Sequence, residues 1–215
     1  MAEHNLSDEF LLALQSLFDW FGAEEVPGTS IGGVAVSLLA QPRVTQDIDA
    51  VIWLEEERWE SFLESGKRYG IVPRIGDALD FVRRARVLLL KHESSGISID
   101  VSVGGLEFER EMIERAVTLK LGELTIKVPT PEDLMITKAV AQRPKDLADM
   151  DAIASATPHL DAQRVRHWVR QFAEVLEMPE IADNVEKVLR YYSAPVKQSP
   201  RSARPKSKAK RKKDK

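Results

Sequence analysis

The spacing of hydrophobic positions is mixed, helical and strand-like, up to about residue 128 and is purely helical afterwards. Residues 6–21 place apolar side chains three and four positions apart, which predicts an amphipathic helix with Ser7 as its cap. Runs of β-branched and aromatic residues predict strands at 29–31, 46–54, 87–91, 97–103, 117–121 and 124–128. Helical spacing and helix-start signals predict helices at 34–40, 55–69, 77–84, 107–115, 131–142, 145–155, 162–177 and 179–192. This order predicts an α+β fold, a small mixed sheet flanked by helices and followed by a helical C-terminal part.

The same pattern predicts three regions along the chain. Residues 1–128 form an α/β core with its N-terminal helix, residues 129–193 form a helical part packed on that core, and residues 194–215 form a basic tail. The net charge of -3 hides this asymmetry, because residues 197–215 hold 10 of the 31 Lys and Arg but only one of the 34 Asp and Glu. The tail has almost no apolar residue to bury, so we expect it to be disordered.

Composition limits the chemistry that is available. The chain has no cysteine and four histidines, so disulfides and thiolate metal sites are excluded and any metal would be bound mainly by oxygen. No apolar run approaches the roughly 20 residues of a membrane-spanning helix. The N-terminus also lacks the basic-then-apolar pattern of a signal peptide. We therefore expect a cytoplasmic protein that does not bind a membrane.

Three aspartates stand in otherwise apolar predicted strands. Asp47 and Asp49 are two positions apart, so a strand would place both carboxylates on one face, with Ile48 on the other. In the predicted strand 97–103 the β-branched residues share one face and Asp100 lies on the opposite one. An isolated Asp-x-Asp is more often a pair of surface acids at a strand edge, and Asp100 could be a solvated partner for an Arg or Lys. Three converging carboxylates, however, suit Mg²⁺ in phosphoryl chemistry.

A Gly32-Gly33 pair precedes the first two acids, between a predicted strand and a predicted helix. Glycines at such a turn let the backbone approach a triphosphate, and the first N–H groups of the following helix can point at it. A Gly-Gly pair alone is weak evidence, but its position before the Asp-x-Asp strand favours a nucleotide site.

In order along the chain, these residues resemble the nucleotidyltransferase superfamily, specifically the nucleotidyltransferase component of abortive-infection type IV toxin–antitoxin systems. The resemblance spans roughly residues 29–154, and the ordered set of motifs is more specific than any one of them. The matching motifs are Ile31-Gly32-Gly33-Val34-Ala35, Arg43-Val44-Thr45-Gln46-Asp47-Ile48-Asp49, Ile99-Asp100-Val101, Val128-Pro129-Thr130-Pro131-Glu132-Asp133-Leu134 followed by Lys138, and Arg143-Pro144-Lys145-Asp146-Leu147-Ala148-Asp149. One departure is Ala40-Gln41-Pro42, where such proteins often have a glycine.

The resemblance implies a nucleotidyltransferase-like fold, Mg²⁺ bound by Asp47, Asp49 and Asp100, and transfer of a nucleoside monophosphate from NTP to an acceptor hydroxyl. Lys138 lies seven residues into a helix capped by Thr130, from which it could reach a phosphate, although it could also be an ordinary exposed lysine.

The remaining candidate site residues have alternatives too. Asp146 could stabilise the start of its own helix, and the resemblance suggests that it assists the acceptor or orients Lys138. Arg43 and Thr45, beside the first acidic strand, are candidates for phosphate contact, while Arg43 could equally cover the acidic pair.

Three functions remain open from the sequence. The first is a toxin-like enzyme that transfers a nucleotide to RNA or protein; the basic tail favours RNA, because clustered Lys and Arg bind polyanions. The second is a nucleotide-binding or partner-binding module that does not catalyse transfer. The third is an enzyme that modifies a small hydroxylated molecule such as an antibiotic. A cognate antitoxin is a further possible partner, and the sequence does not identify the nucleotide.

Overall fold

The computed structural model of the protein describes residues 6–42 and 44–193. The predicted disordered tail and the proposed role of Arg43 lie outside these residues. Within them, the α+β prediction is confirmed: a sheet of five strands is flanked by helices, and a helical part follows.

The main sheet has the strand order β1-β2-β5-β4-β3, and a separate hairpin pairs β6 with β7. Strands β2 and β5 are parallel and the other pairs are antiparallel. The strands are β1 (Gly28–Ile31), β2 (Asp47–Ile52), β3 (Ile71–Pro73), β4 (Val87–His92), β5 (Ser98–Val103), β6 (Val117–Leu121) and β7 (Leu124–Val128).

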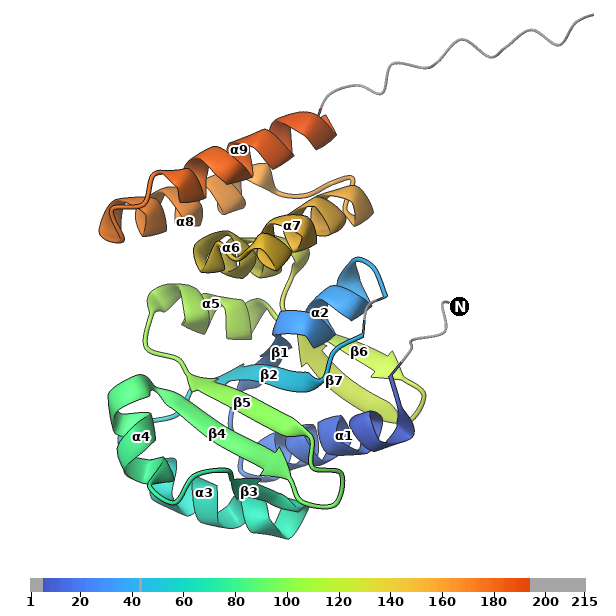
Figure 1. Ribbon diagram of the computed structural model, residues 1–215, viewed down its shortest axis with the longest axis vertical. Helices are drawn as coiled ribbons and strands as arrows, with labels where there is room; N and C mark the ends of the chain where they lie inside the picture. The colour runs from blue at the N-terminus through green and yellow to red at the C-terminus, as the bar shows by residue number, and fades with distance from the viewer. Residues whose placement is uncertain (1–5, 43, 194–215) are drawn as a thin grey trace, which may run out of the picture.

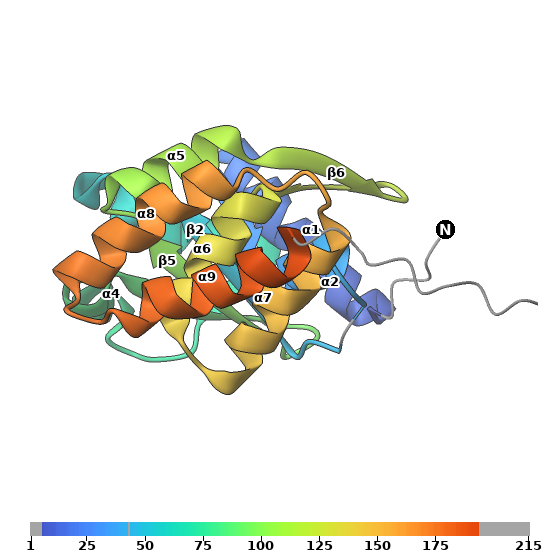
Figure 2. The same ribbon diagram turned by 90° about the horizontal axis from the view of Figure 1, so that it is seen from above.

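Helices cover both faces of this sheet (Figure 1). One side has α1, α3 and α4, and the other has α2, α5 and the C-terminal helices α6 to α9, which lie over the sheet in Figure 2. The α-helices are α1 (Asp8–Ala23), α2 (Gly32–Leu39), α3 (Trp59–Gly66), α4 (Ala78–Ala85), α5 (Glu107–Arg115), α6 (Pro131–Ala141), α7 (Pro144–Ala156), α8 (Ala162–Val175) and α9 (Glu180–Ser193). Short 3₁₀ turns, Glu56–Arg58 and Lys67–Tyr69, flank α3. None of the helices in residues 6–42 and 44–193 is long and apolar enough to cross a membrane.

Strand alternation divides the interior into two hydrophobic cores. Ile48 and Ile99 point to the α1 and α3 side, where they are fully buried with Trp20 and Phe62. Val51 points to the opposite side, into a core shared by α2, α5 and the helices α6 to α9. The helical part therefore packs on the same sheet face as Asp47 and Asp49, because Val51 is two and four positions further along β2. A domain boundary at residue 128 stays a prediction.

A buried ion-pair network joins the helical part to α5. The Asp133 carboxylate on α6 is fully buried and accepts a hydrogen bond from Arg164 on α8 at 2.7 Å. Arg164 also donates to Glu111 on α5 at 2.7 Å, and Arg115 lies 3.3 Å from Asp133. Because such a network contains charges from three helices, it fixes how α6 and α8 sit against α5.

The sequence pattern missed one strand, and several predicted boundaries differ from those of the structure. Strand β3 has three residues and ends at Pro73, so it gives no alternating pattern and lies at the sheet edge, where proline is tolerated. The single helix predicted at 55–69 is instead α3 between two 3₁₀ turns. Helix α2 begins at Gly32 rather than at residue 34, which places the glycines inside its first turn.

Candidate active site

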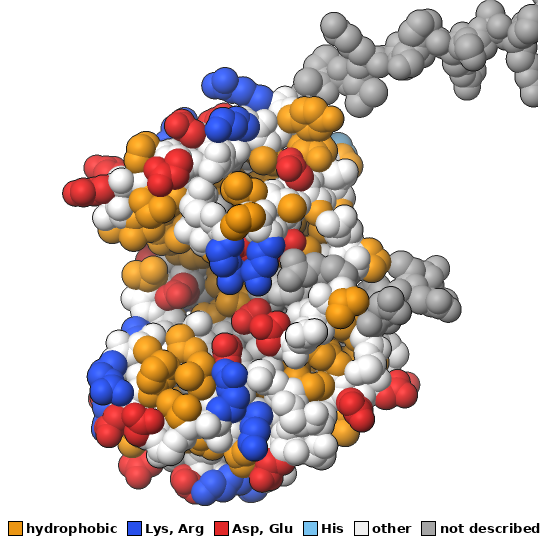
Figure 3. Space-filling view, in the orientation of Figure 1, with side chains coloured by type: hydrophobic (Ala, Val, Ile, Leu, Met, Phe, Trp, Pro, Cys, Tyr) orange, Lys and Arg blue, Asp and Glu red, His pale blue; other side chains and the backbone are white. Residues whose placement is uncertain are grey.

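The three predicted acids line one cavity on the helical side of the sheet. Asp49 on β2 is paired in register with Asp100 on the parallel strand β5, and Asp47 with Ser98. The cavity has a volume of about 330 Å³ and is open to solvent; its lining residues are Ile31, Gly32, Gly33, Asp47, Asp49, Asp100, Thr137, Lys138, Ala141, Arg143 and Lys145. Figure 3 shows acidic side chains facing Lys and Arg side chains across a hollow in the middle of the molecule.

The Gly32-Gly33 turn lies directly against Asp49. Gly32 has a φ of +63°, and a Cβ atom there would lie 1.9 Å from Asp49 Oδ2. The Gly33 N–H donates a hydrogen bond to the Asp49 carboxylate. Glycine is therefore required at position 32 both for its backbone conformation and for the close approach of the acid. The turn and the acidic strand form a single unit.

Gly32→Ala should destabilise the protein by about 1–3 kcal/mol, since it combines an unfavourable φ with a clash against Asp49. The measurement is chemical denaturation at equilibrium. Gly76→Ala is the matched control, because a Cβ atom at Gly76 would meet nothing within 4 Å. Equal stabilities of the two variants would show that the turn does not press against Asp49 as described.

The site has an excess of negative charge on the sheet side. Burial and the neighbouring charges of Asp47 and Asp100 raise the pKa of Asp49 above the usual range of an aspartate. Burial and the charge of Asp47 also raise the pKa of Asp100, while the Arg74 guanidinium acts in the opposite direction. Such mutual repulsion is relieved by a bound cation, and hard oxygen donors are the ligands that Mg²⁺ prefers.

Arg74 is a site residue that sequence reasoning missed. It follows the edge strand β3, and its guanidinium forms an ion pair with the Asp100 carboxylate and donates to Ser98 Oγ at 3.2 Å. Within the described residues, no three Asp, Glu or His side chains already form a group that could hold a metal ion. The three acids thus line one cavity, but Asp100 is engaged by an arginine. Because β3 was not predicted, nothing in the sequence placed Arg74 near Asp100 on β5.

Lys138 on α6 lines the same cavity as Asp47, Asp49 and Asp100, and it is not an exposed lysine. Only 4% of its side chain is exposed, and its Nζ lies 2.9 Å from Asp149 and 3.3 Å from Asp146, both on α7. The electrostatic influence of Lys138 reaches Asp49, whose pKa it lowers. The helix start at Thr130 and Pro131 explains this placement, because the Thr130 hydroxyl accepts from Asp133 N and fixes the first turn of α6.

Asp146 is fully buried at the start of α7 and contacts two cations. Its carboxylate accepts from Lys138 and from Arg143, whose Nε lies 2.5 Å away. Burial raises the pKa of Asp146, but the hydrogen bonds and charges of Arg143 and Lys138 outweigh it, so the pKa is lowered. Asp146 also accepts from the Arg143 backbone N–H, as the helix-start alternative expected. Asp146 thus contacts both Lys138 and the start of its own helix, and its expected role in orienting Lys138 stays a prediction.

Thr45 is the remaining predicted site residue that the structure describes. Its hydroxyl lies 3.1 Å from the Asp47 carbonyl oxygen and 3.2 Å from Asp47 Oδ1. It therefore orients the first acid, and the structure gives no cavity contact for it. Its predicted phosphate contact stays a prediction.

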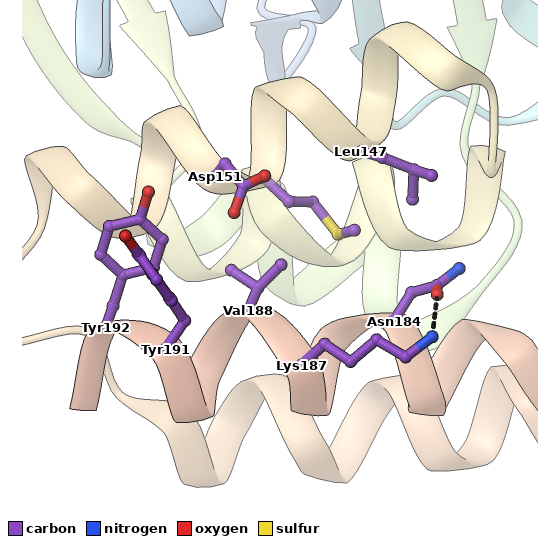
Figure 4. Close-up of a pocket in the computed structure, with 8 residues that line it drawn as sticks. Leu147, Asp151, Asn184, Lys187, Val188, Tyr191 and Tyr192 are labelled. Carbon is purple, nitrogen blue, oxygen red and sulfur yellow. Dashed lines mark hydrogen bonds between the residues drawn. The ribbon is translucent and has the colours of Figure 1, made fainter. Parts of the chain in front are cut away.

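A larger cavity, of about 560 Å³, lies elsewhere, between α7 and α9. Figure 4 shows Leu147 and Asp151 on α7 opposite Lys187 and the adjacent Tyr191 and Tyr192 on α9. Lys187 donates to Asn184 at 3.3 Å in this groove. Among the described residues that line this cavity, only Asp151 is acidic. The cavity therefore lacks the paired carboxylates that metal-assisted phosphoryl chemistry needs. Size alone therefore does not mark the active site.

Comparison with known families agrees with this geometry. The family described as "Nucleotidyl transferase AbiEii toxin, Type IV TA system" matches residues 31–209, which include the glycine turn, the three acids and Lys138. The chain belongs to this AbiEii family. It is accordingly a nucleotidyltransferase, and the resemblance drawn from its motifs is confirmed. No curated protein matches the chain significantly.

Two solved structures show the same fold as this AbiEii family member. The antibiotic-resistance factor ANT(2'')-Ia aligns with a TM-score of 0.54 at 11% identity, covering 79% of this chain and 94% of that protein. The lincosamide antibiotic adenylyltransferase LnuA, in its lincomycin-bound form, aligns with a TM-score of 0.50 at 17% identity, covering 71% and 99%. At these identities the likeness concerns the fold and not the substrate.

Proposed function

We propose that this nucleotidyltransferase transfers a nucleoside monophosphate from an NTP to an acceptor hydroxyl in the cavity between β2, β5 and α6. The observation that supports this most is the opposition of charges across that cavity. Asp47, Asp49 and Asp100 line the sheet side, and Lys138, Arg143 and Lys145 line the helical side. A metal–triphosphate complex needs both, because the metal binds carboxylates and the phosphates bind cations.

Asp47 and Asp49 are the proposed principal ligands of a divalent metal, and Asp100 the third. All three supply hard oxygen donors, and the pKa of Asp49 is raised by burial and by repulsion from Asp47 and Asp100, which a cation would relieve. Bound Mg²⁺ would neutralise the charge that develops on the transferred phosphate. Arg74 contacts one oxygen of the Asp100 carboxylate, Oδ1, so the second oxygen is the proposed metal ligand.

The helical side of the cavity is the proposed phosphate site. Lys138 is held by Asp146 and Asp149, which fix its ammonium group beside the cavity. Arg143 and Lys145 stand at the start of α7, where Arg143 is held by Asp146. The N-terminal end of α2, which contains Gly33, lies at the same cavity, and the positive end of its helix dipole favours an anion there. Together these groups can orient a triphosphate in line with an acceptor hydroxyl.

RNA is the acceptor we propose, because residues 197–215 hold ten Lys or Arg and one acid. Deleting residues 197–215 should weaken binding of total cellular RNA and reduce the steepness with which affinity falls as salt rises. The melting temperature should change little, since residues without apolar side chains add little to a core. Filter binding at several salt concentrations measures the affinity for RNA and its salt dependence. Equal affinities and slopes for the two proteins would move the proposal to a protein acceptor or a small molecule.

Two alternatives stand beside this proposal. The first is a small hydroxylated acceptor, such as the antibiotics to which ANT(2'')-Ia and LnuA, two proteins that share this fold, are linked. A non-catalytic binding module is disfavoured because all three acids are present. The discriminating experiment incubates the protein with each labelled NTP, Mg²⁺ and total cell extract, with and without lincomycin or tobramycin. Label in RNA supports the proposal, whereas label in protein or antibiotic assigns a different acceptor. A cognate antitoxin and a cytoplasmic location remain expectations from the sequence.

A further inference from the structure

A second, apolar pocket of about 190 Å³ opens beside the active-site cavity. Ile31, at the end of β1, and Thr137, on α6, line both spaces, so the two are immediate neighbours. The apolar pocket continues between the sheet, α5 and α8, where Phe108 and Phe172 form part of its wall. The rings of these two residues are perpendicular, with centroids 5.5 Å apart. The pocket thus extends the active site away from its charged groups.

The position of the pocket follows from strand geometry. Side chains two apart on a strand share a face and lie about 6.6 Å from each other. On β2 the row that contains Asp49 continues to Val51, and on β5 the row that contains Asp100 continues to Ser102. Val51 and Ser102 both line the apolar pocket, whereas Asp49 and Asp100 line the charged cavity. The pocket therefore begins one side-chain step beyond the proposed metal ligands.

The chemistry of the lining excludes a triphosphate. Among the described residues that line it, only Glu109 is charged, and that carboxylate already accepts from the backbone N–H groups of Gly105 and Leu106 at 2.8 and 2.9 Å. No Lys or Arg lines this pocket, while three line the charged cavity. The walls are mainly aliphatic and aromatic, with the Ser102 hydroxyl as a polar group at one side. Such a slot suits a flat ring with a polar edge.

We propose that this pocket binds the nucleobase of the donor NTP. The inference rests on the proposed function, because it takes the phosphates to lie between the acids and Lys138. With the α-phosphate at Asp49, the nucleoside must leave the charged cavity in some direction, and this pocket is one side-chain step away. The base is then held by apolar contact with Phe108 and Phe172 and by a hydrogen bond with the Ser102 hydroxyl.

The test compares a whole nucleotide with its phosphates alone. The ligands are NTP analogues with an α,β-methylene bridge, which cannot transfer a nucleotide, and inorganic tripolyphosphate, both with Mg²⁺ and titrated by calorimetry. Two variants fill the pocket from different walls: Ser102→Leu on β5 and Val140→Phe on α6. Ser61→Leu on the exposed surface of α3 is the matched control.

Each filling variant should weaken the preferred NTP analogue at least about tenfold, because the base loses its buried surface. Tripolyphosphate should bind all variants within about twofold of the wild type, which also shows that they are folded. The inference would be overturned if both variants bind the NTP analogue with unchanged affinity. This holds also if their KM for the acceptor rises, because the pocket would then bind the acceptor. An equal loss for both ligands would overturn it as well. If tripolyphosphate fails to bind the wild type, the proposed phosphate site is wrong.

Discussion

Asp49→Asn is expected to reduce nucleotide transfer by about a thousandfold or more, because it removes a central ligand charge from the proposed metal site. The fold should be retained or slightly stabilised. In the metal-free protein, burial and the charges of Asp47 and Asp100 disfavour the ionised form of Asp49, and its pKa is raised for that reason. An amide has no charge to bury in this environment. Steady-state transfer of label from NTP, measured with Mg²⁺, gives the first quantity, and thermal melting gives the second.

Asp80→Asn is the matched control for this variant. Asp80 is an exposed acid on α4 that forms a surface ion pair with Arg83 at 3.3 Å. Surface ion pairs contribute at most about 1 kcal/mol, so this control should keep both activity and stability. Wild-type turnover in the Asp49 variant would mean that the acids on β2 are not the metal ligands.

Lys138→Met is expected to lower the free energy of unfolding by about 3–5 kcal/mol, the largest stability effect we predict. The change leaves Asp146 and Asp149 buried without the ammonium group that contacts both. Transfer should fall as well, since the cavity loses a proposed phosphate ligand. Chemical denaturation at neutral pH measures the first effect. Lys145→Met is the control: Lys145 lines the same cavity but is exposed, so its loss should cost less than about 0.5 kcal/mol.

The structural and catalytic parts of this effect can be separated. Adding Asp146→Asn and Asp149→Asn to Lys138→Met removes the buried charges together and should restore much of the lost stability. Activity should remain low, because the ammonium group is still absent. If the triple variant is no more stable than Lys138→Met alone, the ion-pair triad does not determine stability at this position.

Local patterns in the sequence were enough to predict much of the fold and the acidic row. The alternation of side chains along β2 predicted that Asp47 and Asp49 lie on one face of the sheet and Ile48 on the other, where Ile48 is fully buried. Alternation likewise set Asp100 opposite the buried Ile99 and Val101 on β5. These predictions need only the two-residue period of a strand. That β2 and β5 are adjacent and parallel, however, is a property of the whole sheet, and the alternation within each strand does not predict it.

The interactions that sequence reasoning missed all join residues on different helices or strands. Arg74 contacts Asp100 across β4, and this depends on a three-residue edge strand with no periodic signal. Lys138 was placed correctly on its helix, but its burial depends on how α7 packs against α6. The contact between Gly32 and Asp49 likewise arises from β1 pairing with β2, since Ile31 lies opposite Asp49. The spacing of side chains within one helix or strand does not predict contacts between different helices and strands.

The central claim is that the chain moves the α-phosphoryl group, with its nucleoside, onto an acceptor. It is tested most directly by supplying the acceptor fraction with Mg²⁺ and one NTP labelled either at the α- or at the γ-phosphate. We predict that α-label enters the acceptor, that γ-label is released as pyrophosphate, and that Asp49→Asn abolishes both. Incorporation of γ-label would indicate a kinase-like transfer. That result, or the absence of any incorporation with every NTP, would contradict the account.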